Sequence, residues 1–282
     1  MTHIHFAGLN TANLADDLEG HDVLISFADV MRRPGVWERE MLPRLRAGKY
    51  RRVILDSGAF TVISTPGFHV SVEAYGDFAV EHADLFDVVV NLDDIAGDLK
   101  TTQRNQRHLE ALGLTVMPVF HQGEPWSVLA RYCERYDEIG VGFARKPGGK
   151  LVGGCREFLD AFFRRVPKGV QVHGFGMTKW AVSHGYPFHS VDSTTYIAEY
   201  RALVHAELGS DPKRREGTSN GLRKRLQKIG RDRVMKLVLR SYHQPKRRAF
   251  AASRYVERNS AGQARTVLRR YAPSALAAAL SL

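Results

Sequence analysis

Short apolar segments of β type recur along the first two-thirds of the chain, and they constrain the fold more than any other feature. Eight segments are expected to be strands: His3–Ala7, Asp22–Phe27, Arg52–Leu55, Asp87–Leu92, Thr115–Phe120, Glu138–Gly142, Val170–His173 and Phe188–Val191. Most are separated by stretches with helical periodicity: Val36–Ala47, Val70–Ala83, Lys100–Leu112, Pro125–Arg135 and Arg156–Val166. This alternation predicts parallel strands joined by crossover connections.

Eight such strands fit an α/β fold of the (β/α)₈ type, a TIM-like barrel near the short end of its size range. An open, doubly wound sheet is the alternative. No G-x-G-x-x-G motif follows the first strand, which disfavours the nucleotide-binding form of that alternative. We therefore predict a catalytic barrel domain over residues 1–209 and a basic, mainly helical extension over residues 210–282.

Positive charge is concentrated in the predicted extension. The chain of 282 residues has 41 Lys and Arg against 30 Asp and Glu, and residues 211–272 alone hold 19 basic against 4 acidic residues. This distribution favours a polyanionic partner, with nucleic acid ahead of a membrane surface. The candidate nucleic-acid-binding residues are Lys213, Arg214, Arg215, Arg223, Lys224, Arg225, Lys246, Arg247 and Arg248.

Other features indicate a cytoplasmic protein without a membrane partner. No apolar run approaches the ~20 residues that span a bilayer, and the first residues do not have the pattern of a secretory signal. The only two cysteines, Cys133 and Cys155, form no C-x-x-C pair. This usage is typical of a reducing compartment and predicts neither a disulfide framework nor a structural zinc cluster.

Polar motifs end six consecutive expected strands, where the residues of an α/β barrel that perform chemistry are found. The motifs are L-D-S-G-A-F, N-L-D-D, V-F-H-Q-G-E, G-V-G-F-A-R, V-H-G-F-G-M-T and S-V-D-S-T. Taken singly, each has an ordinary explanation as a turn, a helix cap or a buried histidine. Their expected position on one rim of the barrel favours a functional site.

Carboxylates from three of these strand ends are compatible with glycosyl transfer. Asp56, the Asp93–Asp94 pair and Asp192 provide a nucleophile, a general acid/base and a group that recognises the substrate. Gln122 can present both a donor and an acceptor to the edge of a base.

In this order, the motifs resemble those of the tRNA-guanine transglycosylase superfamily. The closest resemblance, from Val53 to Tyr196, is to the DNA-guanine transglycosylases of phages and bacterial modification islands, which insert 7-deazaguanines into DNA. The resemblance implies a pentosyltransferase in which Asp192 is the nucleophile that forms a covalent glycosyl-enzyme at C1′. It also implies that Asp56 is the acid/base and that Asp93 binds the N1 and exocyclic amine of the purine.

The same resemblance implies the rest of the base pocket and the substrates. Gln122 and the backbone around Gly142 would complete base recognition, and Ser57, His173 and Gly174 would line the pocket. The co-substrate would be a free 7-deazaguanine base, and the target nucleotide in DNA would be flipped out or single-stranded.

Some features depart from the tRNA-directed branch. Its C-terminal zinc site of three cysteines and one histidine has no counterpart here, so no metal or other cofactor is expected. Ala59 stands where those enzymes typically have glycine, and the chain is shorter. These departures favour DNA over tRNA as the substrate.

Three other functions remain alternatives. One is a tRNA-directed transglycosylase. A second is a metal-dependent barrel hydrolase that uses His3 and His5, in H-x-H spacing, together with His121, His173 and Asp192. Both N-terminal histidines are expected at the bottom of the first strand, away from the active rim. The third is a nucleic-acid-binding protein without catalytic activity.

Overall fold

The computed structural model describes residues 2–8, 18–94, 98–144 and 151–194. The chain divides into two compact units, and the first comprises residues 1–181 together with 187–194. The predicted extension and its nine candidate basic residues lie outside the described residues. The domain boundary near residue 210 and the nucleic-acid-binding residues therefore stay predictions.

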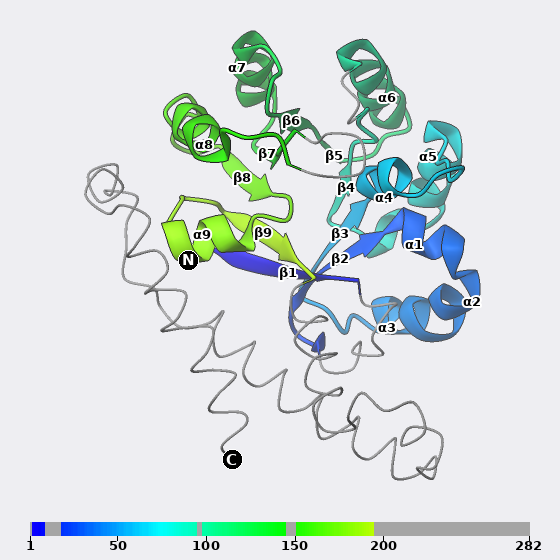
Figure 1. The fold of residues 1–282 in the computed structure, drawn as a ribbon. Helices are drawn as coiled ribbons and strands as arrows, with labels where there is room; N and C mark the ends of the chain where they lie inside the picture. The colour runs from blue at the N-terminus through cyan, green and yellow to red at the C-terminus, as the bar shows by residue number, and fades with distance from the viewer. Residues whose placement is uncertain (1, 9–17, 95–97, 145–150, 195–282) are drawn as a thin grey trace, which may run out of the picture. The chain divides into compact units, whose positions relative to one another are not determined.

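Parallel strands form the centre of the described part of the chain (Figure 1). Its nine strands pair in the order β5-β4-β3-β2-β1-β9-β8-β7-β6. Their bounds are β1 (His3–Ala7), β2 (Asp22–Ser26), β3 (Arg52–Asp56), β4 (Val88–Val90), β5 (Val116–Met117), β6 (Val119–His121), β7 (Glu138–Gly142), β8 (Gln171–Gly174) and β9 (Ser190–Ser193).

The two edge strands of this order, β5 and β6, are halves of one segment divided at Pro118. Proline has no N–H to donate to a neighbouring strand, so the segment changes partner at this residue. Asn91 donates its backbone N–H to the carbonyl of Met117, whereas Gly140 donates to the carbonyl of Pro118. Because β5 pairs with β4 and β6 with β7, the sheet closes, and the predicted (β/α)₈ TIM-like barrel is confirmed.

Helices surround the strands (Figure 1). In chain order they are α1 (Phe27–Arg32), α2 (Pro34–Val36), the π-helical η3 (Trp37–Met41), α3 (Leu42–Arg46), α4 (Ala59–Ser64), α5 (Val72–Glu81), the 3₁₀ turn η4 (Ala83–Leu85), α6 (Leu99–Ala111), α7 (Trp126–Arg135), α8 (Cys155–Phe163) and α9 (Thr178–His184). The longer ones match the predicted helices, whereas the predicted helix Val36–Ala47 is divided among α2, η3 and α3.

Local sequence explains where the longer helices begin. Ser71 caps α5 by accepting a hydrogen bond from the backbone of Ala74, and Asp98 caps α6 by accepting one from Lys100. The short helices α1, α4 and α9 were not predicted, because six or seven residues give too few turns to show helical periodicity.

Apolar side chains fill the layer between the strands and the outer helices. Phe120 of β6 stacks on Trp126 of α7 and on Phe158 and Phe162 of α8, with ring centroids 5.5–6.2 Å apart. These aromatic rings hold α7 and α8 against the barrel.

The barrel interior is apolar on one side and polar on the other. Its apolar cluster consists of Ala7, Leu24, Ile54, Val88, Val90, Met117 and Val119, with Phe175 packed against it. The polar side comes from β1, β8 and β9, where His5, His173 and Ser190 are fully buried. Side chains alternate between the two faces of a strand, so Asp192, two residues after Ser190, lies on this polar side as well. It is in register with His5 of β1.

Ion pairs close the amino-terminal end of the barrel. Arg52 of β3 pairs with Glu138 of β7, on the opposite side of the barrel. Asp22 of β2 accepts hydrogen bonds from Arg51 and lies 3.3 Å from the imidazole of His3. Ion pairs therefore stabilise the amino-terminal end of the barrel. The carboxyl ends of the strands are left as the place for a functional site.

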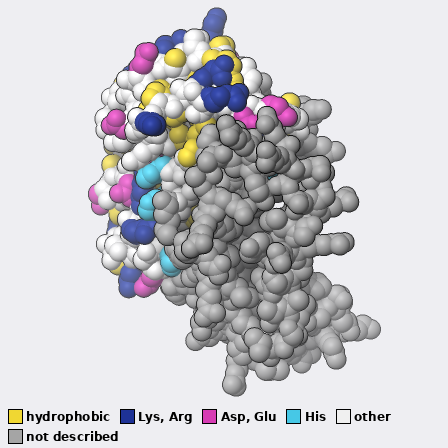
Figure 2. Space-filling view, turned by 90° about the vertical axis from the view of Figure 1, so that its left-hand side faces the viewer, with side chains coloured by type: hydrophobic (Ala, Val, Ile, Leu, Met, Phe, Trp, Pro, Cys, Tyr) yellow, Lys and Arg dark blue, Asp and Glu magenta, His cyan; other side chains and the backbone are white. Residues whose placement is uncertain are grey.

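On the face shown in Figure 2, the basic and acidic side chains of the described residues are interspersed. Within the described ranges, no helix combines the length and apolar character needed to cross a membrane.

Candidate active site at the carboxyl ends of the strands

Three aspartates gather at the carboxyl end of the barrel. Asp56 is the last residue of β3, Asp93 follows β4 by three residues, and Asp192 lies in β9. The charges of Asp93 and Asp192 both act on the carboxyl group of Asp56. The structure therefore brings together the three carboxylates that the strand-end motifs predicted on one rim.

The Asp56 carboxyl group is shifted toward its neutral form. Burial is the largest cause, and the negative charges of Asp93 and Asp192 add to it; together they raise the pKa of Asp56 to about 7. The backbone N–H of Gly58, 2.9 Å from Oδ2, opposes this shift. A carboxyl group that titrates near neutrality can both give and take a proton, as general acid/base chemistry requires.

The D-S-G turn needs glycine at position 58. Gly58 has a φ of 82°, a left-handed conformation that side chains disfavour. A Cβ at this position would lie 2.3 Å from the Cβ of Ala28. The turn thereby directs the Gly58 N–H back to Asp56, while the hydroxyl of Ser57, fully buried, donates to the carbonyl of Asn91.

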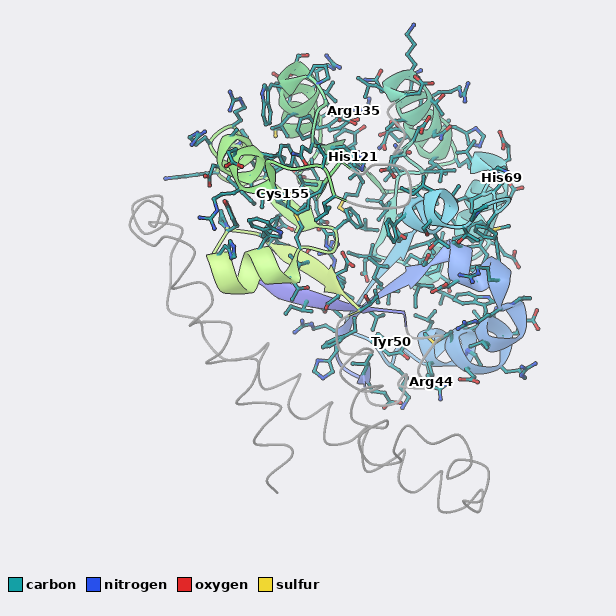
Figure 3. All side chains as sticks on the ribbon, viewed as in Figure 1. Arg44, Tyr50, His69, His121, Arg135 and Cys155 are labelled. Atoms are coloured by element: carbon teal, nitrogen blue, oxygen red, sulfur yellow. The ribbon has the colours of Figure 1, made fainter. Side chains whose placement is uncertain are left out.

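Asp93 forms an ion pair with His121, which Figure 3 shows inside the ring of helices. Nε2 of His121 lies 2.8 Å from Oδ2 of Asp93, and Nδ1 lies 3.5 Å from Glu124. Burial alone would lower the pKa of His121, but the charges and hydrogen bonds of Asp93 and Glu124 raise it to about 10. His121 is therefore an imidazolium held between two carboxylates.

Gly142 leaves room for this imidazolium. Its backbone carbonyl accepts a hydrogen bond from the N–H of Gln122, so β7 lies directly beside the end of β6. A Cβ at Gly142 would lie 2.8–2.9 Å from two ring atoms of His121, closer than side-chain carbons normally approach. The glycine is thus explained by the position of the histidine, and its predicted contact with a base stays a prediction.

Asp192 is held by the β8–α9 connection and by β8. Its Oδ1 accepts a hydrogen bond of 2.6 Å from the backbone of Gly176 and lies 3.7 Å from Nε2 of His173. The hydroxyl of Thr178 donates to the carbonyl of Asp192 at 2.8 Å. The H-G-F-G-M-T motif therefore orients the aspartate of the S-V-D-S-T motif.

Tyr75 fixes the ends of the two strands that carry Asp56 and Asp93. Its buried hydroxyl lies 3.0 Å from the carbonyl of Leu55 and 2.8 Å from that of Val90. Burial, and then the charges of Asp56 and Asp93, raise the pKa of Tyr75, so the hydroxyl remains a donor. A helix that lies outside the barrel thus sets the spacing of two site strands.

Two other predicted site residues have mainly structural surroundings. Gln122 donates its side-chain amide to the carbonyl of Gly153, 2.8 Å away. A Cβ at Gly174 would lie 2.6 Å from the ring of Phe188, so close packing explains this glycine. Their predicted contacts with a base stay predictions.

Sequence reasoning did not identify Glu124, Tyr75 or Ser190 as site residues. Glu124 ends the V-F-H-Q-G-E motif three residues after His121, a spacing that can join the two side chains. For Tyr75, which lies on a helix, and for Ser190, which precedes Asp192 by two residues, the partners depend on three-dimensional packing.

The histidines of the H-x-H motif differ in position. His3 lies at the amino-terminal end beside Asp22, as expected, whereas His5 is fully buried inside the barrel with its ring centroid 5.4 Å from that of His173. In residues 2–8, 18–94, 98–144 and 151–194, no group of three or more His, Cys, Asp or Glu side chains is arranged to bind a metal ion. The described residues therefore provide no metal site for the hydrolase alternative.

No family model matches the sequence, and no curated protein is similar to it. Among solved structures, the chain is similar to the YdjI aldolase from Escherichia coli K12, with a TM-score of 0.51 and 11% identity over 86% of this chain and 91% of the aldolase. Fructose-bisphosphate aldolase from Campylobacter jejuni gives a TM-score of 0.49 and 11% identity, over 86% and 90%. At this identity the comparison establishes the fold alone: the chain is a TIM-like α/β barrel.

Proposed function

We propose that the protein is a DNA-guanine transglycosylase that exchanges guanine in DNA for a 7-deazaguanine base. One observation carries the proposal: Asp56, Asp93 and Asp192 meet at the carboxyl end of the barrel, and the pKa of Asp56 is about 7. Double displacement at an anomeric carbon needs a carboxylate nucleophile and a separate carboxyl group that gives and takes a proton. The ordered strand-end motifs support guanine as the base.

In the first half-reaction, a carboxylate oxygen of Asp192 forms a bond to C1′ of the target deoxyguanosine. The C1′–N9 bond breaks, and its electron pair leaves with guanine, which takes a proton from Asp56. A carboxyl group with a pKa near 7 is protonated in a large fraction of molecules at neutral pH, so it can supply this proton.

In the second half-reaction, the 7-deazaguanine binds in place of guanine. Asp56, now a carboxylate, takes the proton from the nitrogen of the incoming base, and this nitrogen attacks C1′. The ester bond to Asp192 breaks and its electron pair returns to the carboxylate. Two displacements retain the configuration at C1′.

Asp93 is suited to recognising the base. It pairs with the His121 imidazolium, and a carboxylate only accepts hydrogen bonds. Guanine and 7-deazaguanine both present N–H donors on this edge, at N1 and at the exocyclic amine. Adenine presents an acceptor at N1 and would be rejected.

The DNA substrate is supported by the charge of residues 211–272, which contain 19 basic and 4 acidic residues. Such a segment would bind the phosphate backbone, with an affinity that decreases steeply with salt. The target nucleotide would have to leave the base stack for its C1′ to reach Asp192.

The test is incorporation of a radiolabelled 7-deazaguanine into DNA by the full-length protein. Asp192→Ala should abolish incorporation while the fold persists, and Asp84→Ala, at an exposed position of η4, should leave it unchanged. Full exchange by the Asp192 variant would refute the assignment of the nucleophile. Incorporation into tRNA alone would identify the tRNA-directed alternative, and DNA binding without exchange would identify a non-catalytic binding protein.

A further inference from the structure

His173 connects the barrel interior to the proposed nucleophile. It is fully buried in β8 and is in register with Ser190 of β9. Its Nδ1 lies 2.8 Å from Oγ of Ser190, and its Nε2 lies 3.7 Å from Oδ1 of Asp192. Through Nδ1 the imidazole is therefore hydrogen-bonded to Ser190, whereas Nε2 has no hydrogen-bond partner among the described residues and lies near Asp192, on the same face of the neighbouring strand.

The hydroxyl of Ser190 and the carboxylate of Asp192 together determine which nitrogen of a neutral His173 ring carries the proton. This hydroxyl is fully buried, and its one hydrogen-bond partner in the described part of the chain is Nδ1 of His173. If Ser190 donates, Nδ1 is the acceptor and Nε2 carries the proton that faces Asp192. If Ser190 accepted instead, the lone pair of a neutral Nε2 would face a carboxylate oxygen, which is unfavourable.

The ring of His173 is held in this orientation from both sides. The ring centroid of Phe175 is 4.6 Å away and that of His5 is 5.4 Å away, each in an edge-to-face arrangement. Neither ring nitrogen of His5 has a hydrogen-bond partner among the described residues, so His5 packs on His173 without competing for Ser190. Burial, and then the neighbouring His173 and basic side chains, lower the pKa of His5 to about 2, which keeps it uncharged.

The two oxygens of Asp192 consequently have different surroundings. Oδ1 accepts a hydrogen bond from the backbone N–H of Gly176 and lies 3.7 Å from Nε2 of His173. No hydrogen bond to Oδ2 is formed within the described ranges. Among the described residues, Oδ2 is thus the oxygen without a hydrogen bond, whereas Oδ1 already accepts one.

We propose that His173, fixed by Ser190, is a positioning residue that presents a protonated Nε2 to Oδ1 of Asp192 and so selects Oδ2 as the attacking atom. When Oδ2 bonds to C1′, Oδ1 becomes the carbonyl oxygen of the ester, and it keeps the N–H of Gly176 and Nε2 of His173 as its neighbours. The selection of the attacking oxygen rests on the proposed transglycosylase function. The protonation of Nε2 does not, and it can be tested separately.

The protonation state is measured by ¹⁵N NMR on the full-length protein with ¹⁵N-labelled histidine, at neutral pH and without substrate. The signals of His173 are assigned by their loss in His173→Gln. The expected result is a proton on Nε2, and Ser190→Ala should weaken this preference for Nε2. A proton on Nδ1 alone would overturn the proposal, and this result needs only the wild-type protein.

The positioning role is measured by the single-turnover rate at which Asp192 becomes attached to DNA. Glutamine can place an amide N–H near the position of Nε2, whereas asparagine reaches only the position of Nδ1. His173→Asn should therefore slow attachment by roughly 100-fold, in the range found when one preorganised donor is removed, and His173→Gln should recover most of the rate. The affinity for free 7-deazaguanine should change less than about twofold in both variants, because the proposal assigns His173 to Asp192 rather than to the pocket-lining contact that the family resemblance implies.

The outcomes separate the two proposals. Equal losses of rate in both variants, or a loss of base affinity that matches the loss of rate, would overturn the positioning role. A wild-type protein with a proton on Nε2 but without exchange activity would instead refute the transglycosylase proposal and leave the His173–Ser190 arrangement intact.

Discussion

Replacing Asp56 by asparagine should stabilise the protein at alkaline pH. The native pKa of Asp56 is about 7, because burial and the charges of Asp93 and Asp192 disfavour its carboxylate. In the unfolded chain the pKa returns to its ordinary value near 3.8. Between these two values the native state binds a proton that the unfolded state does not, so the contribution of Asp56 to stability decreases as pH rises from about 4 to 7.

The magnitude follows from the difference between the two pKa values. A difference of about three, at about 1.4 kcal/mol for each pKa unit, gives a penalty of about 4 kcal/mol above pH 8. The side chain keeps partial contact with solvent, so this value is an upper bound. Asparagine has the same shape and does not ionise, so the variant avoids the penalty.

The assay is urea unfolding of the wild type and of Asp56→Asn at intervals from pH 4 to pH 9. The free energy of unfolding of the variant should exceed that of the wild type by several kcal/mol at pH 8–9, and the difference should shrink on acidification. Asp84→Asn, at an exposed position, is the matched control and should show no such trend. Parallel pH profiles for wild type and Asp56→Asn would refute the electrostatic account of the site.

Three further substitutions test contacts around the site and at the amino-terminal end of the barrel. Gly142→Ala would place a Cβ 2.8 Å from an imidazole ring and should destabilise the protein by about 1–3 kcal/mol in thermal unfolding, whereas Gly153→Ala, with open space around it, should have little effect. Arg52→Ala would leave Glu138 without its partner and should cost roughly 3 kcal/mol in urea unfolding; an Arg52→Met/Glu138→Leu double variant should recover most of this loss. Tyr75→Phe would remove the hydroxyl that bridges β3 and β4 and should cost about 1–2 kcal/mol; a variant as stable as wild type would contradict the bridging role.

The barrel could be predicted because its strands and longer helices have clear periodicity. The bounds of β1 and β7 are those of the predicted strands His3–Ala7 and Glu138–Gly142. The division of the predicted strand Thr115–Phe120 at Pro118 depends on which neighbour each half pairs with, and the sequence of one segment does not contain that information.

The site was predictable in part for the same reason. Asp56, Asp93 and Asp192 could be expected on one rim because each follows or ends an apolar strand. The contacts of His121 and His173 could not be predicted, since they depend on strand register and on side-chain direction inside the barrel. The sequence also did not show that one interior wall is polar, because polar residues on strands β8 and β9 are equally compatible with a solvated face.

The central claim is that Asp192 forms a covalent bond to the sugar of DNA. The direct measurement is mass spectrometry of the full-length protein after incubation with guanine-containing DNA in the absence of an incoming base. The account predicts an adduct on the peptide that contains Asp192, lost when 7-deazaguanine is added and absent in Asp192→Asn. Base exchange without an adduct at any stage, or an adduct that persists in Asp192→Asn, would contradict it.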